Sequence, residues 1–212
     1  MKCSTLATLA VAGGMIAAAS ATAGIMISQG ETGPTYTDFN LTFDEPGTPT
    51  GPVAPDAFQA DYGLILEAGD GNGQVDDWGT ETGQPWLGTG NSFFGNFGVF
   101  MSFDTDLTAL SMQAWDPAGP PSPFGGGMGI FVFNDGEEIA SSFVTPAWAG
   151  VGESFFDITV TDGMVFDEVR VLGFGFPNTT YADNISWNVV PSPAGLAVMG
   201  IAGLVGGRRR RR

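Results

Sequence analysis

Short segments in which apolar and polar residues alternate run through the whole middle of the chain. Phe39–Phe43, Gly129–Phe133 and Ser154–Val160 are three examples. Successive side chains of a strand point to opposite faces, so a period of two is typical of strands that bury one face. No amphipathic helical period of useful length occurs between Gly24 and Asn188. The pattern therefore predicts an all-β domain.

Turn residues separate these segments. The best hairpin signal is Asn134-Asp135-Gly136, which lies between an apolar arm and a second arm from Glu137 to Phe143; an Asp-Gly pair favours a two-residue turn. The other expected strands are 97–103, 107–112, 165–172 and 181–187, with an Asp-Thr-Asp turn at 104–106. Roughly eight such strands indicate an antiparallel β-sandwich.

The amino-terminal segment has the order of a secretory signal. Lys2 precedes an apolar run from Leu6 to Ala19, and two small-x-small sites follow, ending at Ala21 and Ala23. This order predicts a helical signal peptide over residues 1–23 that is cleaved after Ala23. An uncleaved anchor is the alternative. Cleavage would remove the single cysteine, Cys3, so the mature chain could form no disulfide.

The carboxyl-terminal segment, residues 189–212, predicts a membrane helix. Two prolines stop the preceding strand, because proline cannot donate to a ladder. Residues 194–207 are all apolar or glycine, and Arg208–Arg212 follow. Fourteen residues span roughly 21 Å as a helix, which approaches a hydrocarbon core of about 30 Å once flanking valines and snorkelling arginines are included. The arginines would stay cytoplasmic, which leaves 24–188 as the folded domain.

A proline-led motif, a short Gly/Ala/Leu/Val helix and a basic terminus resemble the PEP-CTERM sorting signal of exported bacterial proteins. The motif here is Val190-Pro191-Ser192-Pro193, with Ser192 where that family usually has glutamate. The resemblance implies recognition by an exosortase, an integral-membrane processing enzyme that removes the tail. Retention of the tail as a plain anchor stays open. In both cases we expect a location at the cell surface or in the extracellular matrix.

The charge distribution excludes one class of partner. All 23 acidic residues lie in the middle of the chain with Arg170 as the single basic residue there, which gives that part a net charge near −22. Such a surface repels phosphates and excludes nucleic-acid binding. The chain contains no histidine, which removes histidine-based catalysis and histidine zinc sites. Carboxylate pairs remain available for a glycoside hydrolase or lyase.

The order of the strands also resembles jelly-roll modules of exported bacterial proteins, among them carbohydrate-binding modules. The resemblance is carried by Leu41–Glu45, Ile158–Val160 and Ala182–Ser186. It implies that the first and last strands lie together and share a structural calcium ion. The matching acidic positions are Asp44, Glu45 and Asp183.

Two further groups of residues are candidate binding sites. Oxygen side chains with the spacing of a calcium loop are Asp70, Asn72, Gln74, Asp76 and Glu81, although Val75 stands where such a loop needs glycine. A solvated acidic loop is the alternative. Trp78, Trp86 and Trp148 lie in loops rich in glycine or proline. They could stack on sugar rings, or they could simply cover a core edge.

Two hypotheses of different classes follow. The first is a non-enzymatic, exported surface or matrix protein whose jelly roll is a binding or structural module, with an extracellular polysaccharide as a candidate partner. The second is a carboxylate-dependent glycoside hydrolase or lyase on the same fold. A pair of carboxyl groups at about 5–5.5 Å or 6.5–9.5 Å in a groove would favour the enzyme.

Overall fold

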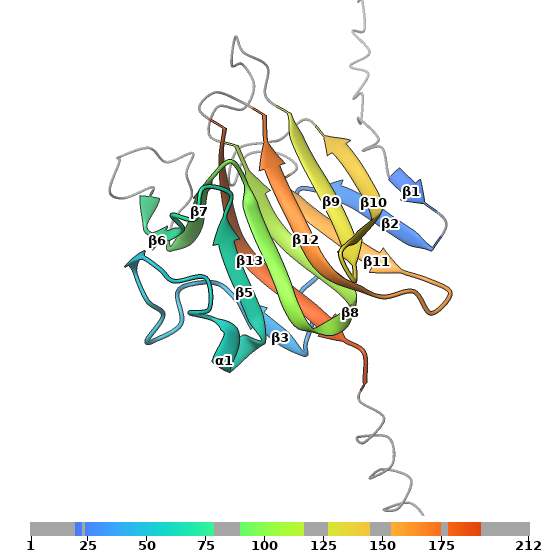
Figure 1. Ribbon diagram of the computed structural model, residues 1–212, viewed down its shortest axis with the longest axis horizontal. Helices are drawn as coiled ribbons and strands as arrows, with labels where there is room; N and C mark the ends of the chain where they lie inside the picture. Colours follow the sequence, from blue (N-terminus) through green and yellow to red (C-terminus); the bar gives the residue numbers. More distant parts are fainter. Residues whose placement is uncertain are drawn as a thin grey trace, which may run out of the picture.

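The structure is a computed structural model. It describes residues 24–78, 90–116, 127–144, 154–174 and 178–191, together with the backbone of residues 20–22. Almost all regular structure in these residues is β-strand (Figure 1), which confirms the all-β prediction. The elements are β1 (Ser20–Thr22), β2 (Ile25–Gly30), β3 (Phe39–Leu41), β4 (Gly51–Pro52), α1 (Gln59–Tyr62), β5 (Leu64–Ala68), β6 (Gln74–Asp76), β7 (Ser92–Asn96), β8 (Val99–Trp115), β9 (Met128–Asn134), β10 (Glu137–Val144), β11 (Phe155–Val160), β12 (Phe166–Gly173) and β13 (Thr179–Val189).

The long strand β8 belongs to two groups of strands. Its first part, Val99–Phe103, pairs with β5 and β12, and β12 continues to β9 and β10. Its last part, Leu107–Trp115, pairs with β11 and β13. That second group extends through β2 to β1 on one side and through β7 and β6 to β4 on the other. In Figure 1, β5, β12, β9 and β10 lie in front of β13, β11 and β2.

Asp104, Thr105 and Asp106 mark the point where β8 changes partners. These three exposed residues were expected to form a turn between two strands. The strand instead continues through them, bending as it passes from one group to the other (Figure 1). The polar residues therefore mark a corner of one strand and not the end of a strand.

One core lies between the two groups. Met101, Val132 and Val169 contribute from the first group, and Leu110, Ile158 and Ile185 contribute from the second. All six are fully buried. Trp187 is 1% exposed and stacks on Phe39 at 5.3 Å, as expected from its alternation with Ile185. The alternating apolar positions of both groups therefore face a common interior.

The predicted hairpin is confirmed. β9 and β10 pair in antiparallel fashion with Asn134 opposite Glu137. Asp135 and Gly136 between them have φ angles of +51° and +79°. Positive φ at both central residues is the geometry that brings a two-residue turn into register with twisted strands.

The first and last strands expected from the sequence lie side by side. β3 pairs with β13 through Leu41 opposite Ile185 and Phe39 opposite Trp187. Towards its start β13 pairs instead with β7, with Ala182 opposite Phe93. Two short strands thus share one side of β13, and the gap between them falls at Asp183 and Asn184.

Parts of the two terminal predictions lie outside the described residues. Residues 1–19 and 192–212 are among those not described, which includes the expected membrane helix. In the described part of the chain, no helix is both long enough and apolar enough to span a membrane. Residues 20–22, the end of the expected signal peptide, form β1 against β2.

Candidate functional site

The gap beside Asp183 is shaped by the backbone of β13. A register shift occurs between Asp183 and Ser186, and Asn184 has a φ of +50°. A bulge of this kind leaves residues out of the ladder and redirects their side chains. Asn184 then donates twice to the Asp183 carboxylate, from its backbone N–H at 2.6 Å and its side-chain amide at 3.1 Å.

Asp44 and Glu45 approach the same gap from the end of β3. Phe43, with a φ of +61°, sends its fully buried ring into the core against Phe58 and Phe93. This turn places the next two residues beside β13. The Asn91 backbone N–H donates to Asp44 Oδ1 at 2.8 Å, which fixes that carboxylate.

One oxygen of Glu45 lacks a partner. Its Oε1 accepts hydrogen bonds from the backbone N–H and the hydroxyl of Thr42, at 2.8 and 3.0 Å. Its Oε2 is buried and has no hydrogen-bond partner among the described residues. An unpaired buried carboxylate oxygen is costly. Glu45 Oε2 is therefore the atom of this site that most needs a hydrogen-bond donor or a cation beside it.

Electrostatics couple the three carboxylates. Burial raises the pKa of Asp183 to about 7, the hydrogen bond from Asn184 lowers it, and repulsion from Asp44 and Glu45 adds to the rise. Asp44 and Glu45 therefore lie near enough to Asp183 for their charges to raise its pKa. Even so, the described residues contain no set of three acidic, histidine or cysteine side chains already arranged around one point as a metal site.

The second predicted cation site has a different geometry. Gln74–Asp76 form β6, and Val75 between them is fully buried against the core. Asp70 instead accepts hydrogen bonds from the Asn72 backbone at 2.9 Å and from the Asn96 amide at 3.0 Å. The Asn96 bond, followed by the Asn72 bond, lowers the pKa of Asp70. Glu81, the twelfth position of the predicted loop, lies outside the described residues.

One of the three predicted sugar-stacking tryptophans is described. Trp78 packs against Phe94 at 5.0 Å and Tyr181 at 5.9 Å. Its indole N–H donates to the Ser92 carbonyl at 3.2 Å. Tyr181 in turn stacks on the buried Trp115 at 5.4 Å. Trp86 and Trp148 lie outside the described residues.

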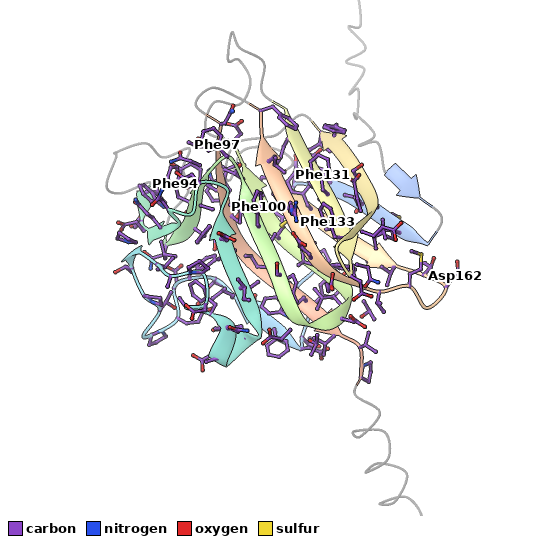
Figure 2. The ribbon with its side chains drawn as sticks, viewed as in Figure 1. Phe94, Phe97, Phe100, Phe131, Phe133 and Asp162 are labelled. Atoms are coloured by element: carbon purple, nitrogen blue, oxygen red, sulfur yellow. The ribbon has the colours of Figure 1, made fainter. Side chains whose placement is uncertain are left out.

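The outer face of the first strand group carries aromatic residues that the sequence analysis did not single out (Figure 2). The Arg170 guanidinium lies over Phe133 at 4.4 Å and Phe100 at 5.4 Å, and its Nε donates to Glu168. Farther along the face, the 69% exposed Phe143 stacks on Phe174 at 5.8 Å. The signal was present in Gly129–Phe133, because Phe131 and Phe133 alternate with the buried Ile130 and Val132.

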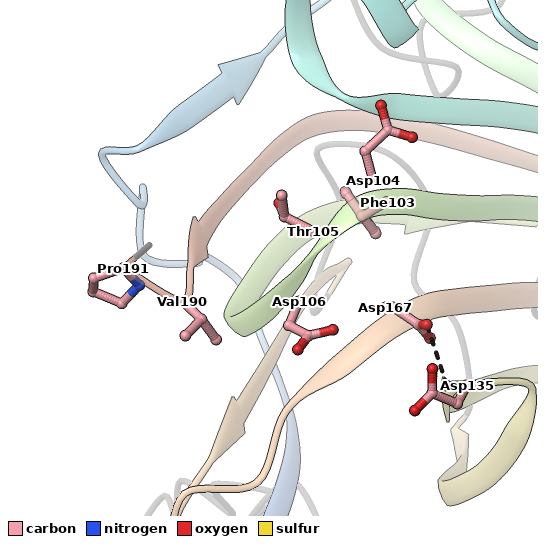
Figure 3. Close-up of a pocket in the computed structure, with 8 residues that line it drawn as sticks. All are labelled: Phe103, Asp104, Thr105, Asp106, Asp135, Asp167, Val190 and Pro191. Atoms are coloured by element: carbon pink, nitrogen blue, oxygen red, sulfur yellow. Dashed lines mark hydrogen bonds between the residues drawn. The ribbon is translucent and has the colours of Figure 1, made fainter. Parts of the chain in front are cut away.

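An open acidic hollow lies beside the corner of β8 (Figure 3). Its volume is about 500 Å³. It is lined by four aspartates, by Phe103 and Thr105 of β8, and by Val190 and Pro191, which follow β13. The aspartates are Asp104, Asp106, Asp135 and Asp167. The Asp135 backbone N–H donates to Asp167 Oδ2 at 3.2 Å, as the dashed line in Figure 3 shows.

The first two residues of the predicted sorting motif lie at this hollow. The Val190 backbone N–H donates to the Asp106 carbonyl at 2.9 Å, so the chain is still tied to the corner of β8 at that point. Ser192 and Pro193, the other two residues of the motif, lie outside the described residues.

Comparison with known proteins adds no relative to this picture. The chain matches no protein-family model, and no curated protein matches its sequence.

Proposed function

We propose that the chain is an exported, surface-anchored, non-enzymatic protein that serves as a binding or structural module. In this proposal residues 1–23 are removed on export and an exosortase-type enzyme processes residues 189–212. The observation that carries the proposal is the position of the motif relative to the fold. β13 ends at Val189, which packs against the edge of the core, and every buried residue of the described core precedes it. A cut within the motif, Val190–Pro193, would therefore leave all of that core in place.

The two strand groups support a finer description of the fold. We propose that they are the two layers of a jelly-roll sandwich. Two sheets that bury one core and exchange a strand at a bent corner are characteristic of sandwich architectures. The adjacency of β3 and β13 is the pairing expected between the first and last strands of such a module.

The tail proposal predicts a specific cleavage. Mass spectrometry of the protein recovered from the cell surface should find peptides up to β13 but none from residues 195–207. Replacing Pro191 and Pro193 together with alanine should leave the tail attached. Pro49→Ala, in an exposed loop, is the matched control and should be processed like the wild type. Recovery of wild-type protein with an intact tail would leave a plain membrane anchor.

We also propose a calcium ion at the β3–β13 junction, held by Asp44, Glu45 and Asp183. Carboxylate oxygens are the ligands that calcium prefers. A cation there would satisfy the buried Glu45 Oε2 and relieve the repulsion that contributes to the raised pKa of Asp183. Because the three side chains are not already gathered around one point, binding would have to draw them together.

An extracellular polysaccharide is the ligand we propose for the module. Aromatic side chains suit the apolar faces of sugar rings, and the outer face around Phe143 and Phe174 presents such rings to solvent. A glycan array probed with the purified protein, with and without a chelator, tests this. Loss of binding in Phe143→Ala would place the ligand on that face. Release of sugar fragments from a bound glycan would instead favour the hydrolase or lyase alternative.

A further inference from the structure

The proposed leader ends inside the folded domain. β1 consists of residues 20–22, which belong to the segment expected to be removed, and it pairs in antiparallel fashion with β2. Ser20 lies opposite Ile27 and Thr22 opposite Ile25. β2 has β11 as its other neighbour. Cleavage after Ala23 would therefore remove the backbone partner of Ile25, Met26 and Ile27 on this edge of β2.

The new amino terminus is held in place without the leader. The Gly24 carbonyl accepts a hydrogen bond from the Thr161 backbone N–H at 2.8 Å. Ile25 and Ile27 are each only 2% exposed and belong to the core. All six residues of β2 pair with β11, from Ile25 opposite Val160 to Gly30 opposite Phe155. The strand would remain in the sheet while its outer edge opened.

This edge lacks the features that protect the other outer strands of the described part. Edge strands avoid unwanted pairing by being short, by carrying charges or proline, or by bulging. β4 has two residues and ends in Pro52, β5 exposes Glu67, and β10 has a register shift after the exposed Glu137 and Glu138. β2, with the sequence IMISQG, contains no charge and no proline.

We propose that removal of the leader opens the edge of β2 for pairing with β2 of a second copy of this chain. This inference rests on the proposed export and cleavage. Two identical strands can pair in antiparallel fashion about a two-fold axis, so the interface needs no other sequence. Each domain has a net charge near −22. An uncharged strand is therefore where two copies can approach with the least repulsion. Until cleavage, β1 occupies this edge at Ile25–Ile27 and keeps the chain monomeric.

Disulfide cross-linking in intact cells tests the proposal on the full chain. Cys3→Ser removes the native thiol, and Ser28→Cys then places one thiol on β2, on the same face as the 43% exposed Met26. Ala60→Cys, on the exposed side of α1, is the matched control. After mild oxidation we expect a covalent dimer of the processed Ser28→Cys protein and none for Ala60→Cys.

Two further variants separate edge pairing from chance contact. Ala21→Leu with Ala23→Leu removes both small-x-small sites, blocks cleavage and should abolish the Ser28→Cys dimer because β1 stays in place. Met26→Asp should also abolish it, because it adds a negative charge to each of the two strands that are proposed to pair, between domains that already repel each other. The processed Met26→Asp protein should melt as one cooperative unit, which would show that the dimer was not lost through unfolding.

Failure of the β2 pairing can be distinguished from failure of the proposed export and cleavage. A processed Ser28→Cys protein without a dimer overturns the pairing and leaves the export proposal intact. A dimer that persists when cleavage is blocked also overturns it, as does a cross-linked product whose mass is not twice that of the chain. If the wild-type chain keeps residues 1–23 at the cell surface, the proposed processing fails, and the inference falls with it.

Discussion

The Tyr36 hydroxyl donates a hydrogen bond of 2.6 Å to Asp157 Oδ1, across 121 positions of sequence. The backbone N–H of the same tyrosine donates to Ser186 Oγ at 3.0 Å. Tyr36 thus connects β11 with β13, the two strands that flank the last part of β8. Two residues farther on, the Asp38 carboxylate accepts from the Val189 backbone N–H at 3.0 Å. Residues 31–38, between β2 and β3, are therefore hydrogen-bonded to both β11 and β13. We call this segment the strap.

Tyr36→Phe should destabilise the protein by about 1–3 kcal/mol, because it removes the donor from a partly buried carboxylate. Burial raises the pKa of Asp157 and the Tyr36 hydrogen bond lowers it, so the substitution should raise that pKa further. The loss should then be larger at pH 8, where the carboxylate is charged, than at pH 4. Urea unfolding at both pH values measures it. Tyr62→Phe, in a tyrosine packed against the core, is the control and should cost little.

Gly33→Ala tests how closely the strap lies on the sheet. A Cβ at Gly33 would come within 2.5 Å of Ser111 Oγ and 2.8 Å of the Phe155 ring. Overpacking of this kind costs about 1–3 kcal/mol. Adding Ser111→Ala should recover part of the loss, because it removes the nearer of the two contacts. A double-mutant cycle in urea measures that coupling, and strictly additive effects would contradict the contact.

Asp183 should make the protein less stable as the pH rises. Its pKa is about 7 in the folded chain against an ordinary value of 3.8, so between these values the folded state binds more protons than the unfolded state. The contribution of Asp183 to the free energy of unfolding is therefore largest below about pH 4 and is lost as the pH rises to about 7. The full shift corresponds to about 4 kcal/mol; partial solvent contact of the side chain reduces our expectation to about 2 kcal/mol.

Denaturation curves at pH 5 and pH 8, in the absence of calcium, measure how steeply the free energy of unfolding changes with pH; we call this the pH slope. Asp183→Asn should flatten it and stabilise the protein at pH 8, because the amide carries no charge to desolvate. Asp162→Asn, in an exposed turn (labelled in Figure 2), should keep the wild-type slope. An unchanged slope in Asp183→Asn would show that other groups govern the pH dependence.

Calcium should oppose the loss of stability that deprotonation of Asp183 causes as the pH rises. An ion that binds only the folded state stabilises it by about 2.7 kcal/mol at one hundred times its dissociation constant. Protons compete for Asp183, so the rise in melting temperature should be greater at pH 8 than at pH 5. Asp183→Ala should abolish the calcium-specific rise, and Asp70→Ala should leave it largely unchanged. Magnesium controls for charge screening, and an equal rise with both ions would argue against a specific site.

Local pattern predicted much of the fold. Alternation located strands at Phe39, Gly129, Ser154 and Tyr181, and the Asp135-Gly136 pair predicted the hairpin. The adjacency of the first and last strands was expected only from the resemblance to jelly rolls, and the pairing of Leu41 with Ile185 agrees with it. The strand and hairpin signals each depend on a few neighbouring residues. They can therefore be recognised in a single sequence.

Features that depend on distant partners were not predictable in this way. β2, β5 and β7 have partners far away in sequence, so their register follows from the assembled sheet. The aspartates of the β8 corner have ordinary turn chemistry, and nothing local distinguishes a turn from a bent strand that exchanges partners. At the candidate site the sequence provided the carboxylates. The bulge at Asn184 and the unpaired Glu45 Oε2, which determine their electrostatics, appear only in three dimensions.

The position of β13 constrains when the domain can fold. β13 is the last strand in sequence, yet it lies between β8 on one side and β3 and β7 on the other. A chain that emerges from a ribosome or a membrane pore with its amino terminus first can complete its central ladder only once residue 189 is out. The apolar segment begins five residues later. Under the proposed export, closure of the domain and arrival of the proposed membrane segment at the bilayer would be nearly simultaneous, and the domain would spend most of its transit unfolded.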